Sequence, residues 1–318
     1  MRLIDLPVCV HRTGRYLVIK SERHALRYLS KICRKNGHRI CAYCRGREVY
    51  QIPDKRFRCK RCKARFNLFT NRWYGRLNIT ASQPVPARTD LSGWRTAWPG
   101  GWLWLIKLFE LETSSRRIAS PPVPIRAGEI KLSYPTALKA TNLIRQAIAT
   151  ESKDYEFLLK GEVEADESYF GGHRKGKRGR GAANKIPVFG ILERNGIVSV
   201  DVVPNVGAQT LLNMTIKKVR RGSIVYTDKF RCYDSLMFCG YRHLKIDHSK
   251  YFSSGKVYIN GLEGFWSFAK ERLMKYHGVS KEKFPYYLKE LEYRYNNRDK
   301  NLFSLLTKIL ADFVPIVL

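Results

Sequence analysis

Four cysteines arranged as two CxxC pairs constrain the fold of this chain more tightly than any other feature of its sequence. Cys41 and Cys44 form the first pair, and Cys59 and Cys62 form the second after fourteen intervening residues. The intervening segment has the pattern of a strand, a turn and a strand, and such a hairpin would bring the pairs together. The spacing therefore predicts a four-thiolate Zn²⁺ site. Because four thiolates leave no open coordination position, we expect this zinc to stabilise the fold and not to catalyse a reaction.

The charge of the chain restricts its partners. The 318 residues include 59 Lys and Arg against 27 Asp and Glu, a formal net charge of +32. A surface so positive attracts polyanions and releases their counterions, so nucleic acid is the expected partner. A basic protein that binds a ribosome or an acidic membrane surface is the alternative that composition leaves open.

No segment is expected to cross a membrane. The strongest apolar run, residues 100–109, is too short for a bilayer and contains Lys107. The N-terminal residues lack the continuous apolar stretch of a secretory signal. We therefore expect a cytoplasmic, nucleoid-associated protein whose cysteines stay reduced. Four cysteines lie outside the CxxC pairs and are expected to be small apolar residues: Cys9, Cys33, Cys232 and Cys239.

Two helical patterns lie between residues 102 and 150. Two short helices that flank a turn predict a helix-turn-helix-like unit, and the second helix carries the basic residues Lys139 and Arg145. A helical spacer that does not contact DNA is the alternative. The prolines between the two patterns, at 121, 122 and 124, exclude a regular helix there.

The second half of the chain carries acidic residues at the ends of predicted elements. In GEVEADESYFGG, residues 161–172, alternation predicts a strand with Glu162, Glu164 and Asp166 on one face. A hairpin follows, which turns at Asn195-Gly196. Asp228 then ends a buried, β-branched strand in GSIVYTDKF.

The stretch INGLEGFWSFAK predicts an amphipathic helix with polar residues at the edge of its buried face. Glu263 and Lys270 are seven residues apart, so they lie about 20° from each other around the helix, with Asn260 nearby. A surface ion pair would explain both charges, but this spacing is long for direct pairing. We expect the aromatic residues Phe265 and Trp266 to lie in the core.

The order of elements predicts an α/β fold of the RNase H-like type, a mixed five-stranded sheet with helices. Its acids would come from the first strand, the fourth strand and a late helix. Glu164 and Glu167 compete with Asp166 as the first acid, and Asp234 competes with Asp228. The helices after residue 282 are expected to pack on the sheet. The predicted divisions are an N-terminal helical segment (1–35), a zinc ribbon (36–72), a linker (73–101), the helix-turn-helix-like unit (102–150) and the RNase H-like domain (155–318).

Five strings occur together and in order: VEADESYFGG, KGKRGRGAANK, VYTDKFRCYD, INGLEGFWSFAKERL and LEYRYNNR. With them, residues 161–298 resemble the catalytic domain of bacterial insertion-sequence DDE transposases that carry an N-terminal zinc ribbon. The resemblance implies that Asp166, Asp228 and Glu263 are the three catalytic acids. Asn260 and Lys270 match the polar positions around the third acid, and Asn260 is the alternative third ligand. It also implies recognition of terminal inverted repeats by an assembly of at least two subunits.

Metal chemistry follows from the three acids. Converging carboxylates repel one another unless a cation neutralises them, and hard oxygen ligands suit Mg²⁺ or Mn²⁺. Two such ions roughly 3.5–4 Å apart support in-line phosphoryl transfer. The expected function is cleavage of the element's ends in double-stranded DNA and strand transfer to target DNA. A non-catalytic DNA-binding protein and a metal-dependent nuclease without joining activity are the alternatives.

A glycine-rich basic loop lies between the first two predicted strands. Its cationic side chains suit the DNA backbone and not the reading of bases, although a solvated loop is the alternative. His248 could also position DNA, or have a structural role. The candidate DNA-binding residues of the loop are Arg174, Lys175, Lys177, Arg178, Arg180 and Lys185.

Overall fold

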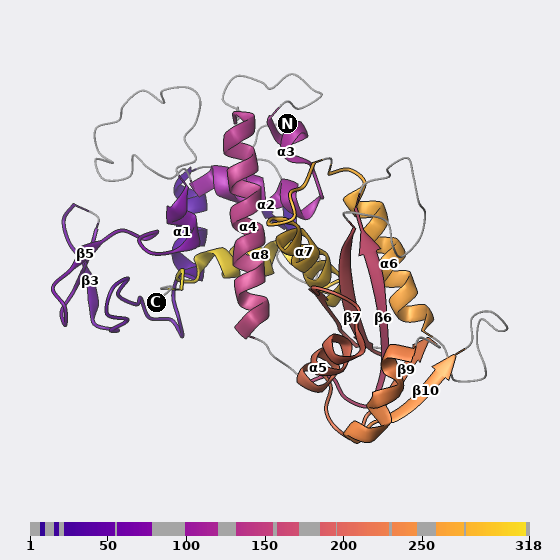
Figure 1. Cartoon of the computed structure of the whole chain (residues 1–318). Coiled ribbons are helices and arrows are strands. Elements are labelled where there is room, and N and C mark those ends of the chain that lie inside the picture. The colour runs from indigo at the N-terminus through magenta and orange to yellow at the C-terminus, as the bar shows by residue number, and fades with distance from the viewer. Residues whose placement is uncertain are drawn as a thin grey trace. The chain divides into compact units, whose positions relative to one another are not determined.

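The computed structural model divides the chain into two compact units. The first contains residues 1–151 together with 299–318, and the second contains residues 152–298. Both ends of the sequence therefore contribute to the first unit. No helix among the described residues is long and apolar enough to cross a membrane. The structure describes residues 7–9, 16–18, 22–54, 56–77, 99–119, 132–154, 158–171, 185–194, 196–228, 231–246, 259–276 and 278–315 (Figure 1).

The cysteine pairs of the first unit lie in a small antiparallel sheet, as the spacing predicts. Its strands are β3 (Val49–Gln51), β4 (Phe57–Cys59) and β5 (Arg65–Phe66), in the order β3-β4-β5. The rings of Phe57 and Phe66 lie 5.9 Å apart and form the buried side of this sheet. The predicted hairpin between the CxxC pairs is therefore present.

The remaining elements of the first unit are mostly helical. The C-terminal helix α8 packs against α1, α2 and η2, and the Tyr74 hydroxyl donates to the Thr307 carbonyl at 2.9 Å. The expectation that this helix packs on the five-stranded sheet is wrong, because its apolar stripe is buried within the first unit. The elements are β1 (Pro7–Cys9), β2 (Tyr16–Val18), α1 (Glu22–Ile32), η2 (Trp73–Arg76), α2 (Pro99–Glu110), α3 (Ser115–Ala119), α4 (Tyr134–Asp154) and α8 (Leu302–Ala311).

Helices α2, α3 and α4 occupy the region for which a helix-turn-helix-like unit is predicted. One of its two basic residues, Arg145, is buried, with its guanidinium carbon 5.4 Å from the centre of the Phe109 ring. Arg145 is therefore a core residue, and Lys139 is the exposed basic residue of the pair. The helix-turn-helix interpretation stays a prediction. The prolines at 121, 122 and 124 lie outside the described residues.

A mixed five-stranded sheet forms the centre of the second unit. Strand β6 pairs antiparallel with β7 and parallel with β9, while β7–β8 is antiparallel and β9–β10 is parallel. The strand order β10-β9-β6-β7-β8 is the RNase H-like arrangement, which confirms the predicted fold class. The strands are β6 (Glu162–Phe170), β7 (Ile186–Glu193), β8 (Val198–Val202), β9 (Ile224–Asp228) and β10 (Arg242–Ile246).

Helices cover both faces of this sheet. Helix α5 (Ala208–Lys218) and η4 (Arg231–Cys239) pack over one face, where Val163 and Ala165 are buried. Helix α6 (Asn260–Leu273) lies along β6 in Figure 1, and with α7 (Phe284–Asn296) it covers the other face. Side chains alternate along a strand. Glu164 and Asp166 therefore point to the face that α6 covers, opposite to Val163 and Ala165.

Helix α7 also covers the outer edge of β8. The Asn296 side chain accepts from the Val198 N–H and donates to the Val198 carbonyl, both at 2.8 Å. One turn earlier, Glu292 accepts from the Val200 N–H and Lys289 donates to the Val200 carbonyl, also at 2.8 Å. Unpaired strand edges promote aggregation, so these side chains protect the edge as a further strand would.

Candidate active site and zinc centre

Two of the predicted acids lie on neighbouring strands. The parallel ladder between β6 and β9 ends with Glu164 opposite Tyr226, and Asp166 and Asp228 each lie two residues beyond that pair. Their electrostatic interaction agrees with this placement. Burial, together with the negative charges of Glu167 and Asp228, raises the pKa of Asp166 to about 7. Two acids from the central strands therefore form a site that favours a cation or a proton.

The side chain of Asp166 has a specific hydrogen-bond donor. The indole Nε1–H of Trp266, on α6, donates to Asp166 Oδ2 at 3.0 Å. Trp266 is buried, and its ring packs edge-on against Phe170 and Phe265. The expectation that Phe265 and Trp266 are core residues is confirmed. The hydrogen bond to Asp166 was not predicted, because it depends on the tertiary contact between α6 and β6.

Glu164 holds the beginning of α6 on the sheet. Its side chain is buried, and Oε2 accepts from the Leu262 backbone N–H at 2.9 Å. Arg194 donates to Oε1 at 3.2 Å and also pairs with Glu162 at 2.7 Å. Negative charge at a helix N-terminus is stabilising because the first backbone N–H groups have no partners within the helix. Glu164 therefore caps the helix that carries the third predicted acid.

A close approach of backbone and side chain accompanies this cap. A Cβ atom on Gly261 would lie 2.9 Å from Glu164 Oε2 and 2.9 Å from Leu192 Cδ2, closer than packing allows. Glycine at the second position of α6 thus lets Glu164 reach the helix end. From the sequence, Glu164 is expected only as an alternative to Asp166. Its alternation with Asp166 and the glycine after Asn260 are the signals that could have indicated the cap.

Glu263 lies in the first turn of α6, directly after the capped Leu262. Its side chain is exposed, as are those of Asn260 and Lys270. Among the described residues, the cysteine cluster is the one group of metal-ligand side chains that converges as closely as a bound ion requires. Asp166 and Asp228 therefore lie on neighbouring strands without forming such a group with Glu263 in this structure, and the catalytic roles of all five residues, Asn260 and Lys270 included, stay a prediction.

The other acid beside Asp166 points to the opposite face of the sheet. Glu167 is buried, and its Oε2 accepts from the Tyr233 hydroxyl at 2.8 Å on the α5 side. Glu167 therefore acts on Asp166 through its charge and does not share its face. The side chain of Asp234 lies outside the described residues, as does His248.

Most of the predicted DNA-binding loop also lies outside the described part of the chain. Lys185 is described, and it is partly buried directly before β7. The undescribed loop residues are Arg174, Lys175, Lys177, Arg178 and Arg180.

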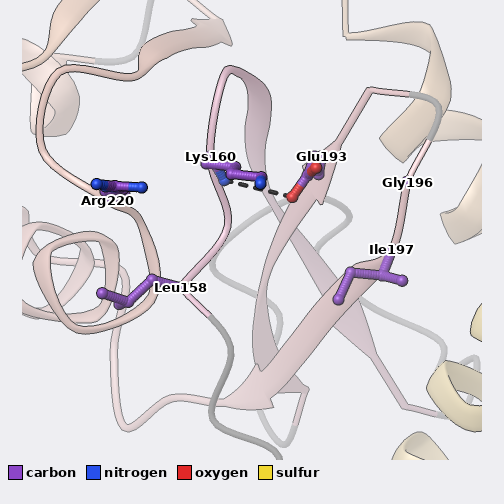
Figure 2. Close-up of a pocket in the computed structure, with 6 residues that line it drawn as sticks. All are labelled: Leu158, Lys160, Glu193, Gly196, Ile197 and Arg220. Carbon is purple, nitrogen blue, oxygen red and sulfur yellow. Dashed lines mark hydrogen bonds between the residues drawn. The ribbon is translucent and has the colours of Figure 1, made fainter.

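A separate pocket of about 520 Å³ lies beside the connection between β7 and β8 (Figure 2). The Lys160 backbone N–H donates to Glu193 Oε2 at 3.3 Å at its rim. None of the predicted catalytic or metal-binding residues lines this pocket. Its lining residues are Leu158, Lys160, Glu193, Gly196, Ile197 and Arg220.

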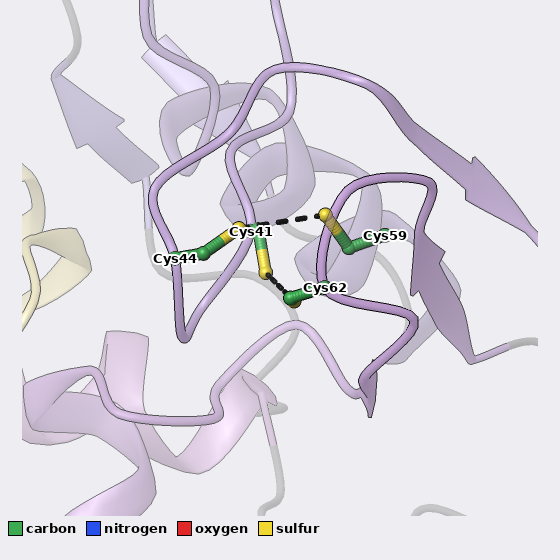
Figure 3. A group of neighbouring side chains, drawn as sticks. All are labelled: Cys41, Cys44, Cys59 and Cys62. Carbon is green, nitrogen blue, oxygen red and sulfur yellow. Dashed lines mark hydrogen bonds between the residues drawn. The ribbon is translucent and has the colours of Figure 1, made fainter.

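The four paired cysteines converge in the first unit (Figure 3). The sulfur atoms of Cys41 and Cys62 are 3.5 Å apart, and those of Cys44 and Cys59 are 3.6 Å apart. A tetrahedral Zn²⁺ with Zn–S bonds of about 2.3 Å places its sulfur ligands about 3.8 Å apart. The sulfur positions and the soft thiolate donors therefore fit structural Zn²⁺.

The two halves of the cysteine cluster have matching backbone turns. The Cys41 N–H donates to the Gly46 carbonyl at 2.9 Å, and the Cys59 N–H donates to the Ala64 carbonyl at 3.1 Å. In each half the residue after the second cysteine, Arg45 or Lys63, has a positive φ, of 61° and 60°. Such turns point backbone N–H groups at the sulfur atoms.

The backbone and the surroundings act differently on the thiols. The Gly46 backbone N–H lowers the pKa of Cys44 to about 7. Burial raises the pKa of Cys41 to about 12. A metal ion must therefore provide most of the free energy that keeps Cys41 as a thiolate.

The chain combines an RNase H-like unit with a four-cysteine ribbon. Comparison with protein families identifies both parts as domains of transposases. A model of the ISXO2-like transposase domain matches residues 158–296, and a model of the transposase zinc-ribbon domain matches residues 20–65. The chain is 46% identical over 110 residues to an uncharacterized transposase-like protein of Haemophilus influenzae, covering 34% of this chain and 89% of that protein. The protein belongs to the ISXO2-like transposase family.

A second relative extends over most of the chain. An uncharacterized protein in the transposable element ISH50 of Halobacterium salinarum is 27% identical over 299 residues, covering 86% of this chain and 90% of that protein. Among solved structures, the Mos1 transposase paired-end complex with left transposon end is 14% identical, with a TM-score of 0.23. That match covers 60% of this chain and 71% of the Mos1 chain.

Proposed function

We propose that this transposase cuts the ends of its own insertion sequence and joins them to target DNA by metal-dependent in-line phosphoryl transfer. The observation that supports the proposal is that Asp166 and Asp228 lie two residues beyond the last pair of the β6–β9 ladder and that the charge of Asp228 acts on Asp166. In a transposase family member, a pair of half-buried, mutually repelling carboxylates is a candidate metal site and not a source of fold stability.

The residues fit Mg²⁺ or Mn²⁺. Carboxylate oxygens are the hard donors that these ions prefer, and burial with the charges of Glu167 and Asp228 raises the pKa of Asp166, which a bound cation would offset. Asp166 and Asp228 would hold the ions, and Glu263 would complete the ligand set from α6, with Asn260 as the alternative. When bound, a pair of such ions supplies activation of the attacking oxygen and stabilisation of the leaving oxygen.

The remaining groups would act on the DNA. Lys270 lies two turns after Glu263 on α6, and its ammonium would bind a phosphate of the scissile strand as a point charge. The basic residues between 174 and 185 would hold the DNA backbone without reading bases. The formal charge of +32 supports this sequence-independent attraction to double-stranded DNA.

End recognition and assembly belong to the same proposal. The zinc ribbon and the helices of the first unit would recognise the terminal inverted repeats. Because the two ends of an element must be joined together, at least two copies of the chain would act in one complex.

The proposal is tested with purified protein, Mg²⁺ and duplexes that carry the element's own ends. Joined products are expected, and the Asp228→Asn variant should lose about 10³-fold in rate, as expected if metal binding contributes roughly 4 kcal/mol to catalysis. Glu193→Gln is the matched control, since Glu193 is an acid of the same sheet at the pocket far from Asp166.

Each other outcome has a distinct meaning. Cleavage without joining favours a metal-dependent nuclease, and gel shifts without any product favour a non-catalytic DNA-binding protein. Full activity of Asp228→Asn contradicts the assignment of the site.

A further inference from the structure

One tryptophan connects the helix α6 to the first predicted acid. Trp266 Nε1 donates to Asp166 Oδ2 at 3.0 Å, and the indole is 4% exposed. The indole nitrogen is a hydrogen-bond donor only. Asp166 is therefore the acceptor in this hydrogen bond. The Glu167 backbone N–H also donates to this carboxylate, so Trp266 provides the donor that comes from α6.

The sheet has a gap into which this indole fits. Gly190 on β7 is the direct ladder partner of Asp166, so a side chain at 190 would lie on the same face of the sheet as the acid. A Cβ atom there would lie 2.7 Å from Trp266 Cζ2 and 2.8 Å from Cη2. A rigid ring cannot yield at those distances, so glycine at 190 is what allows the indole to lie flat beside Asp166.

Neighbouring rings restrict the indole from its other sides. Phe170 packs edge-on at a centroid distance of 5.9 Å, and Phe265 packs edge-on at 5.4 Å. The position of the N–H group is therefore determined by rigid packing and not by a mobile side chain. A donor fixed in this way restricts rotation of the Asp166 carboxylate about its last torsion angle.

We infer that Trp266, held by Gly190, is a positioning residue that orients the Asp166 carboxylate for metal binding together with Asp228. The inference rests on the proposed function, in which Asp166 and Asp228 hold the metal ions. Groups that orient metal ligands through hydrogen bonds typically change metal affinity or activity by about 10–100-fold when they are removed. Phenylalanine would fill most of the same space without the N–H group.

Terbium provides a direct readout in the full-length protein. Tb³⁺ is a hard, oxygen-seeking ion that can replace Mg²⁺, and its emission is sensitised by a nearby excited indole. Trp266 is the only tryptophan between residues 152 and 298. We expect sensitised emission from the wild-type protein, and its loss in both Asp166→Asn and Trp266→Phe.

Affinity is measured separately, by direct excitation of Tb³⁺. Trp266→Phe should weaken Tb³⁺ binding about 10–100-fold, and Gly190→Ala should weaken it similarly by displacing the ring. In the double variant the second change should add little, because both act through the same hydrogen bond. Leu288→Ala is the control: it removes a buried side chain of the same core, so it should lower the melting temperature without changing Tb³⁺ affinity.

The outcomes separate this inference from the proposed function. If Asp166→Asn leaves Tb³⁺ affinity unchanged, the metal site itself is wrong, and the positioning role of Trp266 is overturned with it. If Asp166→Asn weakens binding while Trp266→Phe and Gly190→Ala do not, only the positioning role is overturned. Should both of those variants fail to fold, the wild-type emission decides: Asp166-dependent binding without sensitised emission overturns the inference.

Discussion

Glu164 offers the most quantitative test of how the fold positions α6. Replacing it by alanine removes the acceptor of the Gly261 N–H and one of two acceptors of the Leu262 N–H, which keeps the Ile259 carbonyl at 3.1 Å. Each buried donor left without an acceptor costs about 1–3 kcal/mol. Arg194 keeps a partner in Glu162, so its own cost is small. The expected loss for Glu164→Ala is therefore about 2–4 kcal/mol in the free energy of unfolding of the second unit, from one unsatisfied donor and one weakened hydrogen bond.

Glu162 is a matched control for this variant. It also pairs with Arg194, at the shorter distance of 2.7 Å, but its side chain is 41% exposed against 1% for Glu164. Exposed ion pairs contribute about 0–1 kcal/mol, and Glu162 also accepts from the Tyr226 hydroxyl at 3.0 Å, so Glu162→Ala should cost about 1–2 kcal/mol without disturbing α6. Glu164→Gln keeps an oxygen acceptor and should lie between the two alanine variants.

Urea denaturation measures these free energies, and hydrogen exchange measures the local effect. Amide exchange in residues 260–273 should accelerate in Glu164→Ala, because the first turn of α6 loses its cap. In Glu162→Ala the same amides should keep their protection. If the two alanine variants have equal stability and equal exchange in α6, Glu164 does not anchor the helix and the reasoning is refuted.

Three further predictions follow from the described contacts. Cys59→Ser, or a zinc chelator, should remove about one zinc ion per chain and unfold the ribbon, as seen by metal analysis and circular dichroism; retention of zinc would contradict the site. Because the folded pKa of Asp166 is raised from 3.8 to about 7, its carboxyl lowers the stability of the metal-free protein as pH rises through that window. Asp166→Asn should therefore gain more stability at pH 8 than at pH 5 in urea titrations with EDTA, and an equal gain would count against the shift. Asn296→Ala should cost about 1–3 kcal/mol and promote aggregation measured by light scattering, because it uncovers the β8 edge at Val198; unchanged solubility would argue that other contacts protect the edge.

Local patterns predicted the parts of the fold that depend on neighbouring residues. Alternation along β6 predicts that Glu164 and Asp166 share a face, and both contact α6. The spacing of the cysteines predicts the hairpin that brings them together. In each case a short-range period determines which side chains point the same way.

Tertiary partners could not be predicted in the same way. The apolar stripe of α8 fits any apolar surface, and only the structure assigns it to the first unit. A basic residue such as Arg145 looks exposed in sequence, yet it is buried beside an aromatic ring. The roles of Glu164 and Trp266 depend on contacts between residues about a hundred positions apart.

The central claim is that Asp166 and Asp228 share divalent metal ions. An anomalous difference map from crystals soaked with Mn²⁺ tests it most directly. We predict a peak within ligand distance of an oxygen of each of these two carboxylates, with Glu263 or Asn260 completing the ligand set. A map whose Mn²⁺ peaks lie elsewhere, with both carboxylates unligated, would contradict the account.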